Sequence, residues 1–405
     1  MIDVEKIRQD FPILQRKIGE KQLVYLDSAA TAQRPRQVIE AVKHFWEHSN
    51  ANVARSLHTL AEESTEAYEN ARKKTAAFIG AGNDEVIFTR NTTEAANLVM
   101  RGYGEKFLHG TDTVTTTITE HHSNFVPWQW LAHKKSGKFE VINIGPDGLL
   151  DENEFDKIDK ANLLAITMAS NVLGTINDVK KICRLAREVN AITFVDAAQA
   201  VPGMPVDVRE IGCDFLAFSG HKMMAPFGIG VLYGRKQLLE QMDPLLYGSE
   251  MIRKVSIEES EWNEIPQKFE AGTPTVDAAV GLSAALDYLN ALGMQNVRKH
   301  EETLTAQAMD AIERAGARIV GPRDAKKRTG LVAFSIDGVH PHDVAMVLNA
   351  EGIAIRSGHH CAMPIHTQLQ LPQGTSRASF YIYNSPEEIV ALETALKKVR
   401  QIFSK

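Results

Sequence analysis

The sequence predicts an α/β protein in which a mostly parallel central sheet has helices on both faces and a smaller α+β domain follows. Short apolar runs alternate with helical patterns up to about residue 285, which implies right-handed crossovers between parallel strands. Several runs are apolar at successive positions rather than at alternate ones, as expected of strands covered on both faces. The expected strands are residues 85–89, 113–119, 139–144, 163–169, 192–195 and 215–218.

The stretches between these strands have the spacing of amphipathic helices. Residues 63–79 place apolar side chains on one helical face, and Gly80 can end that helix because glycine adopts the left-handed conformation freely. Residues 178–190 repeat the same spacing. Such helices would connect the strands and cover the sheet.

The pattern changes towards the C-terminus, where helices and separated strands no longer alternate regularly. We therefore expect two domains, a large α/β domain at 21–285 and a small α+β domain at 286–405, on which residues 1–20 also pack. The helices and strands expected in the small domain are residues 303–315, 317–320, 331–336, 353–356, 378–383 and 386–403.

The composition excludes several classes of protein. The 405 residues include 45 Lys plus Arg and 51 Asp plus Glu, a net charge of −6, so we expect no broad attraction to nucleic acid or anionic lipid. No apolar run reaches membrane-spanning length, and the charged first residues lack the apolar core of a signal peptide. The three cysteines have no C-x-x-C spacing, which argues against a disulfide framework, a metal site or an iron–sulfur site. We expect a cytoplasmic protein without a bound metal.

A carboxylate and a lysine follow two of the expected strands. Asp196 comes directly after 192–195, and Lys222 ends the segment Ser219-Gly220-His221-Lys222 after 215–218. Because ligands of open α/β sheets bind beyond the carboxyl ends of the strands, both side chains should face one crevice. A lysine that forms an imine and a carboxylate that keeps a pyridine nitrogen protonated are what pyridoxal phosphate requires. Either residue alone is more often a solvated lysine or a turn-forming aspartate, but the pair favours the cofactor.

Residues 85–94 supply a candidate phosphate site. A strand, a turn and a helix start place Thr92 and Thr93 at a helix N-terminus, where hydroxyl and backbone N–H groups can hold an anion. The alternative is that one of these threonines only caps the helix. No complete nucleotide-binding motif of the G-x-x-x-x-G-K-[ST] or G-x-G-x-x-G type occurs.

Two histidines, His121 and His122, follow a third expected strand. A histidine at this position could stack on a cofactor ring and exchange protons with it. Adjacent residues of an extended segment point to opposite faces, which disfavours a metal site formed by this pair.

Three segments are the most distinctive: residues 219–222, Phe269-Glu270-Ala271-Gly272-Thr273-Pro274, and Arg356-Ser357-Gly358-His359-His360-Cys361-Ala362-Met363-Pro364. With them, and over nearly the whole chain from Phe11-Pro12-Ile13-Leu14 to Ser376-Arg377-Ala378-Ser379, the sequence resembles the class-V aminotransferase-like cysteine desulfurases. Within that family it is most similar to the SufS group. The resemblance implies the type I fold of pyridoxal-phosphate enzymes.

The resemblance also implies roles for single residues. Lys222 is the imine-forming lysine and the base that moves the Cα proton, and Asp196 is the partner of the pyridinium nitrogen. Gln199 bonds the phenolic oxygen of the ring, and His121 stacks on the ring. The implied phosphate ligands are Thr92, Thr93, Ser219 and His221, with Gly272 and Thr273 contributed by the other subunit of a homodimer that shares its active sites.

The substrate implied by the resemblance is an amino acid. Arg377 and Asn171 are similar to the clamp for its carboxylate, which a bidentate guanidinium fits well, and Arg356 is a second cation near that clamp.

Cys361 decides which reaction the resemblance implies. Removing sulfur from cysteine needs a nucleophile that attacks the substrate Sγ and leaves as a persulfide. The thiolate is the reactive form, which Arg356 or a protonated His359 or His360 could favour. The other two cysteines have the positions of buried small apolar residues. The implied enzyme converts L-cysteine to L-alanine and passes the Cys361 persulfide to an acceptor of SufU or SufE type for iron–sulfur cluster assembly.

Several alternatives stay open at this level. One is a selenocysteine lyase or cysteine sulfinate desulfinase, another is an aminotransferase of the same fold, and a third is a non-catalytic sulfur-transfer scaffold. The segment His340-Pro341-His342-Asp343 resembles that of relatives that use the zinc-containing acceptor SufU, although exposed loop histidines are more often incidental.

Two places depart from the family pattern. Ala54 and Ser56 stand where a histidine and a glycine are usual, and Asn91 stands where a glycine usually precedes the threonine pair. Neither departure changes the imine lysine, its carboxylate partner or the nucleophile, so we expect activity, at a rate that can differ from that of relatives.

Overall fold

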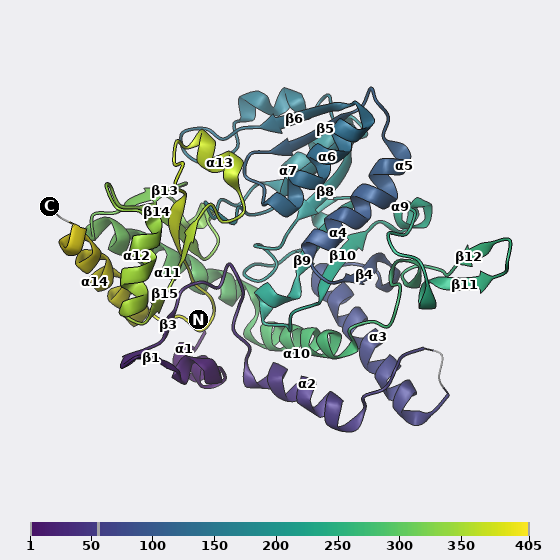
Figure 1. Cartoon of the computed structure of the whole chain (residues 1–405), viewed down its shortest axis with the longest axis horizontal. Helices are drawn as coiled ribbons and strands as arrows, with labels where there is room; N and C mark the ends of the chain where they lie inside the picture. Colours follow the sequence, from purple (N-terminus) through teal and green to yellow (C-terminus); the bar gives the residue numbers. More distant parts are fainter. Residues whose placement is uncertain (1, 55–56, 404–405) are drawn as a thin grey trace.

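A seven-stranded sheet lies at the centre of the computed structural model, which describes residues 2–54 and 57–403 (Figure 1). Its strands run parallel except β10 (Gly230–Gly234), which pairs antiparallel with both neighbours. This is the mostly parallel sheet that the sequence predicts. Across the sheet the order is β4 (Val86–Thr89), β10, β9 (Phe215–Ser219), β8 (Ile192–Asp196), β7 (Leu163–Thr167), β5 (Thr113–Thr117) and β6 (Lys138–Ile142).

Successive residues of the central strands enter two different apolar cores. Leu164 and Ile166 of β7 pack in one core, whereas Leu163 and Ala165 pack in the other. Because both faces are covered, β7 and β9 are buried at every position, which explains their largely apolar runs. The helices of the first core include α3 (Thr59–Ile79), α7 (Val179–Glu188) and α10 (Val276–Leu292), and those of the second include α4 (Thr92–Val99) and α6 (Val126–Lys135).

A four-stranded antiparallel sheet lies apart from the central sheet (Figure 1). It packs around an apolar core of its own with α11 (Met294–Arg314), α12 (Pro341–Ala350) and α14 (Pro386–Phe403). Its strands are, in order, β13 (Arg318–Val320), β14 (Leu331–Ser335), β17 (Thr375–Ser379) and β16 (Arg356–Gly358).

The structure corrects two of the expected strands. The strand expected at 378–383 is wrong in its second half, because β17 ends at Ser379 and the Asn384 N–H then bonds the carbonyl of Tyr381 in a turn. The strand expected at 353–356 is two strands in different sheets, since β15 (Ile353–Ala354) pairs with β3 (Val24–Tyr25) and β16 pairs with β17. An apolar run alone does not reveal which neighbour a strand selects.

The N-terminal segment contacts both parts of the molecule. Arg8 of α1 (Val4–Gln9) donates to Glu388 on α14 at 2.8 Å, while Tyr288 on α10 donates to Asp10 at 2.8 Å. The ring of Phe11 packs in the core beneath the central sheet. The domain boundaries expected from the sequence stay a prediction.

Within the described residues, each helix is either too short or too polar to cross a membrane.

Candidate active site

A cavity of about 250 Å³ opens where β8 and β9 end, and it is also lined by residues that follow or belong to β16 and β17. Every site residue expected from the sequence lines this cavity except Gly272 and Thr273. Those brought together are Thr92, Thr93, His121, Asn171, Asp196, Gln199, Ser219, His221, Lys222, Arg356, Cys361 and Arg377. Both sheets therefore contribute side chains to one cavity.

Lys222 lies in the 3₁₀ turn Gly220–Met223 directly after β9. Burial lowers the pKa of its ammonium to about 8, although the nearby Asp196 carboxylate acts in the opposite direction. A larger fraction of this amine is therefore neutral at physiological pH than of a surface lysine, as imine formation requires.

Asp196 ends β8 and is buried. Burial raises the pKa of its carboxyl group, while Lys222 and the Ala198 N–H, which donates to Oδ1 at 2.9 Å, favour the anion. A buried carboxylate that needs a cationic partner fits the protonated nitrogen of a pyridine ring.

The N-terminus of α4 also lines the cavity. Asn91 caps the helix by accepting from the Glu94 N–H at 3.0 Å, so the alternative that Thr92 or Thr93 provides the cap is wrong. The Thr92 N–H donates to Ser219 Oγ at 3.0 Å, which joins α4 to the end of β9. The first residue of β10, Gly230, also lies against the start of α4, and a Cβ on it would lie 2.5 Å from Asn91 Cα.

His121 is held as a neutral ring. Burial and the neighbouring Lys222 lower the pKa of His121 to about 3. Its Nδ1 accepts from the Ser123 N–H at 3.1 Å, which places the ring proton on Nε2. A neutral, oriented imidazole on the cavity wall is suited to stacking on a cofactor ring and not to acting as a permanent cation.

Arg377 is buried on β17 with part of its guanidinium unused. Nη1 donates to the carbonyl of Asn171 at 2.6 Å and Nη2 donates to Asp27 Oδ1 at 3.2 Å. Nε has no partner among the residues that the structure describes, and the same is true of Asn171 Oδ1 and His221 Nδ1. Buried polar atoms are normally satisfied, so these three indicate that a polar ligand belongs in the cavity.

Asp27 is the site residue that the sequence analysis missed. Its carboxylate lies 3.2 Å from Arg377 and 3.8 Å from Arg356. Burial raises the pKa of Asp27, and the two guanidinium groups oppose that shift. Its signal in the sequence was only its place within residues 11–379, over which the resemblance extends.

Cys361 is exposed at the cavity, in a loop between β16 and α13 (Met363–Gln368). His360 and Cys361 both have left-handed backbones, with φ of 50° and 56°. The loop contacts the large sheet's side of the cavity through Asn171 Nδ2, which donates to the His360 carbonyl at 2.5 Å.

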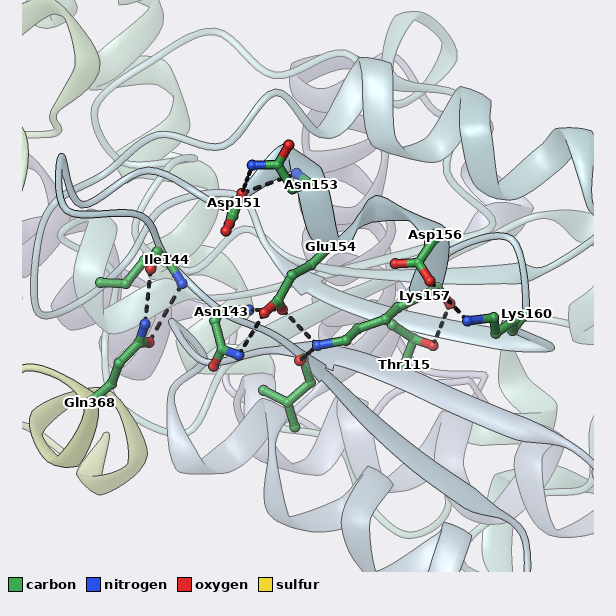
Figure 2. A network of polar contacts seen from close by, with 11 residues as sticks. Thr115, Asn143, Ile144, Asp151, Asn153, Glu154, Asp156, Lys157, Lys160 and Gln368 are labelled. Atoms are coloured by element: carbon green, nitrogen blue, oxygen red, sulfur yellow. Dashed lines mark hydrogen bonds and ion pairs between the residues drawn. The ribbon is translucent and has the colours of Figure 1, made fainter.

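α13 is itself docked beyond the end of β6. Gln368 Nε2 donates to the Ile144 carbonyl at 2.9 Å, and Figure 2 shows the Gln368 amide facing both backbone groups of Ile144. The segment that carries Cys361 is thus fixed to the central sheet's side of the molecule at both of its ends.

One expectation about the thiol is wrong. Burial, with Arg377 close by, lowers the pKa of His360 to about 2, so this ring is neutral and cannot supply positive charge to Cys361. Its Nε2 lies 2.9 Å from Thr375 Oγ1, within the small sheet. Arg356, which lines the cavity, and His359 remain as the cations expected near the thiol.

Gly272 and Thr273 lie in a different groove, together with Phe88 and Arg90. They do not reach the cavity of their own chain.

The departures from the family pattern lie at two places. Asn91 is the helix cap described above. Ala54 is exposed, does not line the cavity and has a left-handed backbone with φ of 71°, and Ser56 lies outside the described residues.

Comparison with known proteins identifies the class. The sequence model of the family named aminotransferase class-V matches residues 24–392, so the chain belongs to that family.

Two full-length relatives are named as cysteine desulfurases. The chain is 48% identical to a probable cysteine desulfurase of Streptomyces coelicolor, covering 100% of this chain and 98% of that protein. It is 45% identical to a cysteine desulfurase of Haloferax volcanii, again covering 100% of this chain and 98% of the relative.

Solved structures agree in fold. The apo cysteine desulfurase of Thermococcus onnurineus NA1 superposes with a TM-score of 0.95 at 39% identity, covering 100% of this chain and 99% of that one. The cysteine desulfurase CsdA of Escherichia coli, in an S-sulfonic acid form, gives 0.91 at 36% identity and 99% coverage of both chains. The architecture is thus the type I fold of pyridoxal-phosphate enzymes, and the cofactor of this family is pyridoxal phosphate. Lys222, Asp196 and the unsatisfied atoms of the cavity fit that group.

Proposed function

We propose that this chain is a cysteine desulfurase that converts L-cysteine to L-alanine and retains the sulfur as a persulfide on Cys361. The observation that carries the proposal is the position of Cys361. The thiol lines the same cavity as Lys222 and the Arg377 clamp, so an amino acid bound by its carboxylate has both an amine and a thiol beside it. An aminotransferase would need no thiol there.

The residues of the chain divide the work between them. Arg377 binds the substrate carboxylate through the Nε donor left free in the cavity. Asn171 supports this clamp, because its backbone carbonyl accepts from Arg377 Nη1 at 2.6 Å. Pyridoxal phosphate, when bound, supplies an electron-accepting ring next to the substrate Cα. Lys222, with its lowered pKa, is the amine that takes and returns the Cα proton. Asp196 would hold the ring nitrogen, and Gln199 and His121 would hold the rest of the ring.

Sulfur transfer itself needs no outside oxidant. The Cys361 thiolate attacks the substrate Sγ, a sulfur–sulfur bond forms and the Cβ–Sγ bond breaks. The electron pair left on Cβ takes up a proton, so the carbon is reduced while the two sulfur atoms become a persulfide. The carbon skeleton leaves as alanine.

The direct test uses the purified protein with pyridoxal phosphate. The protein should be yellow, and with cysteine and a reductant it should release sulfide and alanine in equal amounts. Formation of a keto acid in place of alanine would identify an aminotransferase, and a colourless protein that never binds the cofactor would reject the proposal altogether.

We further propose that the persulfide passes to an acceptor protein for iron–sulfur cluster assembly. Exposed His342 supports an acceptor of the zinc-containing SufU type, because it lies beside the strand that leads to Cys361. A Cβ on Gly358 of that strand would be 3.8 Å from His342 Nε2. A SufE-type acceptor is the alternative. If SufU is the acceptor, His342→Ala should abolish stimulation by SufU and leave turnover with reductant unchanged.

The partner contribution of Gly272 and Thr273 is also a proposal, which implies a homodimer with shared sites. Their position in a groove away from the cavity of their own chain supports it. Mixed dimers of Lys222→Ala and Gly272→Asp subunits provide the test. If Gly272 acts across the interface, one site of each mixed dimer is intact and activity returns, whereas a site built within one chain stays defective in both subunits.

We propose a cytoplasmic location and retain the domain boundaries 21–285 and 286–405, with 1–20 on the smaller part. The separate apolar core around the four-stranded sheet supports the division, and protection of two fragments with these ends during limited proteolysis would test it.

A further inference from the structure

His122 makes two hydrogen bonds to the Cys361 loop, one at Cys361 and one two residues after it. Its backbone N–H donates to the Cys361 carbonyl at 2.7 Å. Its ring Nε2 accepts from the Met363 N–H at 3.0 Å. The His122 ring does not line the cavity that His121 lines.

The loop needs such support because its backbone is unfavourable by itself. His360 and Cys361 are consecutive non-glycine residues with φ of 50° and 56°, a conformation that such residues keep only where their surroundings impose it. The Ala362 N–H bonds the His359 carbonyl at 2.9 Å, which closes the turn but does not attach it to anything else. Attachment to the central sheet's side comes from Asn171 before the thiol and from His122 at and after it.

The ring bond exists only while His122 is neutral. Nε2 can accept a hydrogen bond when the proton is on Nδ1, whereas a doubly protonated ring would present an N–H to the Met363 N–H. Burial and the nearby His359 lower the pKa of His122 below its ordinary value of 6.5. The ring is therefore neutral near physiological pH and becomes protonated in more acidic solution.

The groups that can alter this equilibrium are few. His121 precedes it with ring centroids 6.4 Å apart, His359 faces it from the Cys361 loop, and Arg101 of the helical segment after α4 borders the same surface pocket. The Cys361 thiol is the remaining titratable group beside it. Apart from that thiol these groups are neutral or positive, so none of them stabilises a protonated His122.

We propose that the neutral His122 side chain is a positioning residue, which holds the Cys361 loop so that the thiol faces the cavity and releases the loop when the ring is lost or protonated. The inference rests on the proposed function in assigning the nucleophile to Cys361. It adds that the His122 ring, together with the Asn171 bond, sets how long the thiol stays at the substrate and how readily it turns outward.

The test compares His122→Ala and His122→Gln in the full-length holoenzyme without cysteine. The glutamine carbonyl can accept from the Met363 N–H but cannot be protonated, and both variants keep the backbone bond to Cys361. The matched control is His133→Ala, an exposed histidine on α6 whose ring lies edge-on to Phe139 with centroids 6.4 Å apart. The readouts are amide hydrogen exchange at 359–363 and the rate of Cys361 alkylation by iodoacetamide.

For His122→Ala we expect exchange at Met363 and alkylation of Cys361 to accelerate about fivefold, the factor that corresponds to one lost hydrogen bond. His122→Gln and His133→Ala should match the wild type near neutral pH. As the pH falls below 6.5, exchange at Met363 in the wild type should rise relative to His122→Gln. A loosened loop presents the thiol less often, whereas the Arg377 clamp for the substrate is unchanged. The alanine variant should therefore have a lower kcat for cysteine and an unchanged KM.

Equal exchange and alkylation rates in His122→Ala and wild type would overturn the proposal, as would an unchanged ratio between wild type and His122→Gln across pH. Neither readout requires turnover. A loop that loosens as expected in a protein that releases no sulfide would therefore reject the proposed function and leave the positioning role intact.

Discussion

Asp27 accepts a hydrogen bond from Arg377 at 3.2 Å while its second oxygen lies 3.8 Å from Arg356. Two guanidinium groups and one carboxylate leave a single positive charge, which matches one substrate carboxylate. The aspartate therefore both orients Arg377 and limits how much negative charge the site attracts.

Asp27→Asn should change which anions bind. Asparagine keeps an acceptor for Arg377 but removes the negative charge, so the affinity for a dianionic amino acid should rise about tenfold relative to a monoanionic one. Competitive inhibition by cysteine sulfinate and by alanine measures this ratio. Asp159→Asn, an exposed charge removal, is the control and should leave the ratio unchanged.

Cys361→Ala should lower sulfide release from cysteine by about 100-fold or more, because no other described thiol lies at the cavity to accept the sulfur. The yellow cofactor absorbance should persist, since Lys222 and Asp196 are unchanged.

The control for that variant is Cys183→Ala, which removes a buried thiol from the core beneath the sheet. It should keep its activity per folded molecule. Substantial sulfide release by Cys361→Ala would exclude the persulfide route, whereas retained turnover of selenocysteine or cysteine sulfinate alone would favour the corresponding lyase or desulfinase.

Lys222 should be unusually reactive in the protein stripped of cofactor. With a pKa of about 8, its amine is neutral far more often at pH 7 than that of a surface lysine, so an amine-selective acylating reagent should modify it about tenfold faster. Asp196→Asn removes the anion that raises this pKa and should increase the rate further. Mass spectrometry of the labelled peptides gives both rates, and adding pyridoxal phosphate should protect Lys222.

The buried histidines predict acid-sensitive stability. The pKa of His360 is about 2 in the folded protein against 6.5 as its ordinary value, so the unfolded chain binds a proton that the folded chain excludes. Above pH 6.5 this difference in proton binding costs the folded protein nothing. As the pH falls from 6.5 towards the folded pKa, the free energy of unfolding decreases. Between pH 6.5 and pH 5 the loss for His360 is about 1–2 kcal/mol.

Urea unfolding of wild type and His360→Asn at these two pH values measures that loss. The asparagine variant should show a shallower decline in the free energy of unfolding. If the free energy of unfolding fell equally with pH in both proteins, His360 would have the same pKa in the folded and the unfolded chain, which would contradict the prediction.

Much of this arrangement follows from sequence because it depends on local pattern. Continuous apolar runs predict buried strands, and polar residues directly after such runs predict where side chains meet, which is how Asp196 and Lys222 could be paired 26 positions apart. The closing helix Pro386–Phe403 follows equally well from its spacing.

What the sequence could not predict depends on partners that are remote along the chain. Residues 353–356 divide between two sheets because β3 and β17 compete for them. Asp27 gains its importance from Arg377, 350 positions away. The charge of His360 is set by burial, which a motif of adjacent histidines does not reveal.

The cavity lies between two apolar cores, one under the central sheet and one around the small sheet, and a further apolar cluster brings Leu173 together with Val320 and Ala333 of the small sheet. Lys222 belongs to the part of the chain that contains the first core, and Arg377 lies on β17 in the part that contains the second. Catalysis therefore depends on the alignment of these two parts of the chain. On gradual heating, turnover should fade before either core melts, and a ligand that bridges Lys222 and Arg377 should raise the inactivation temperature more than the melting temperature.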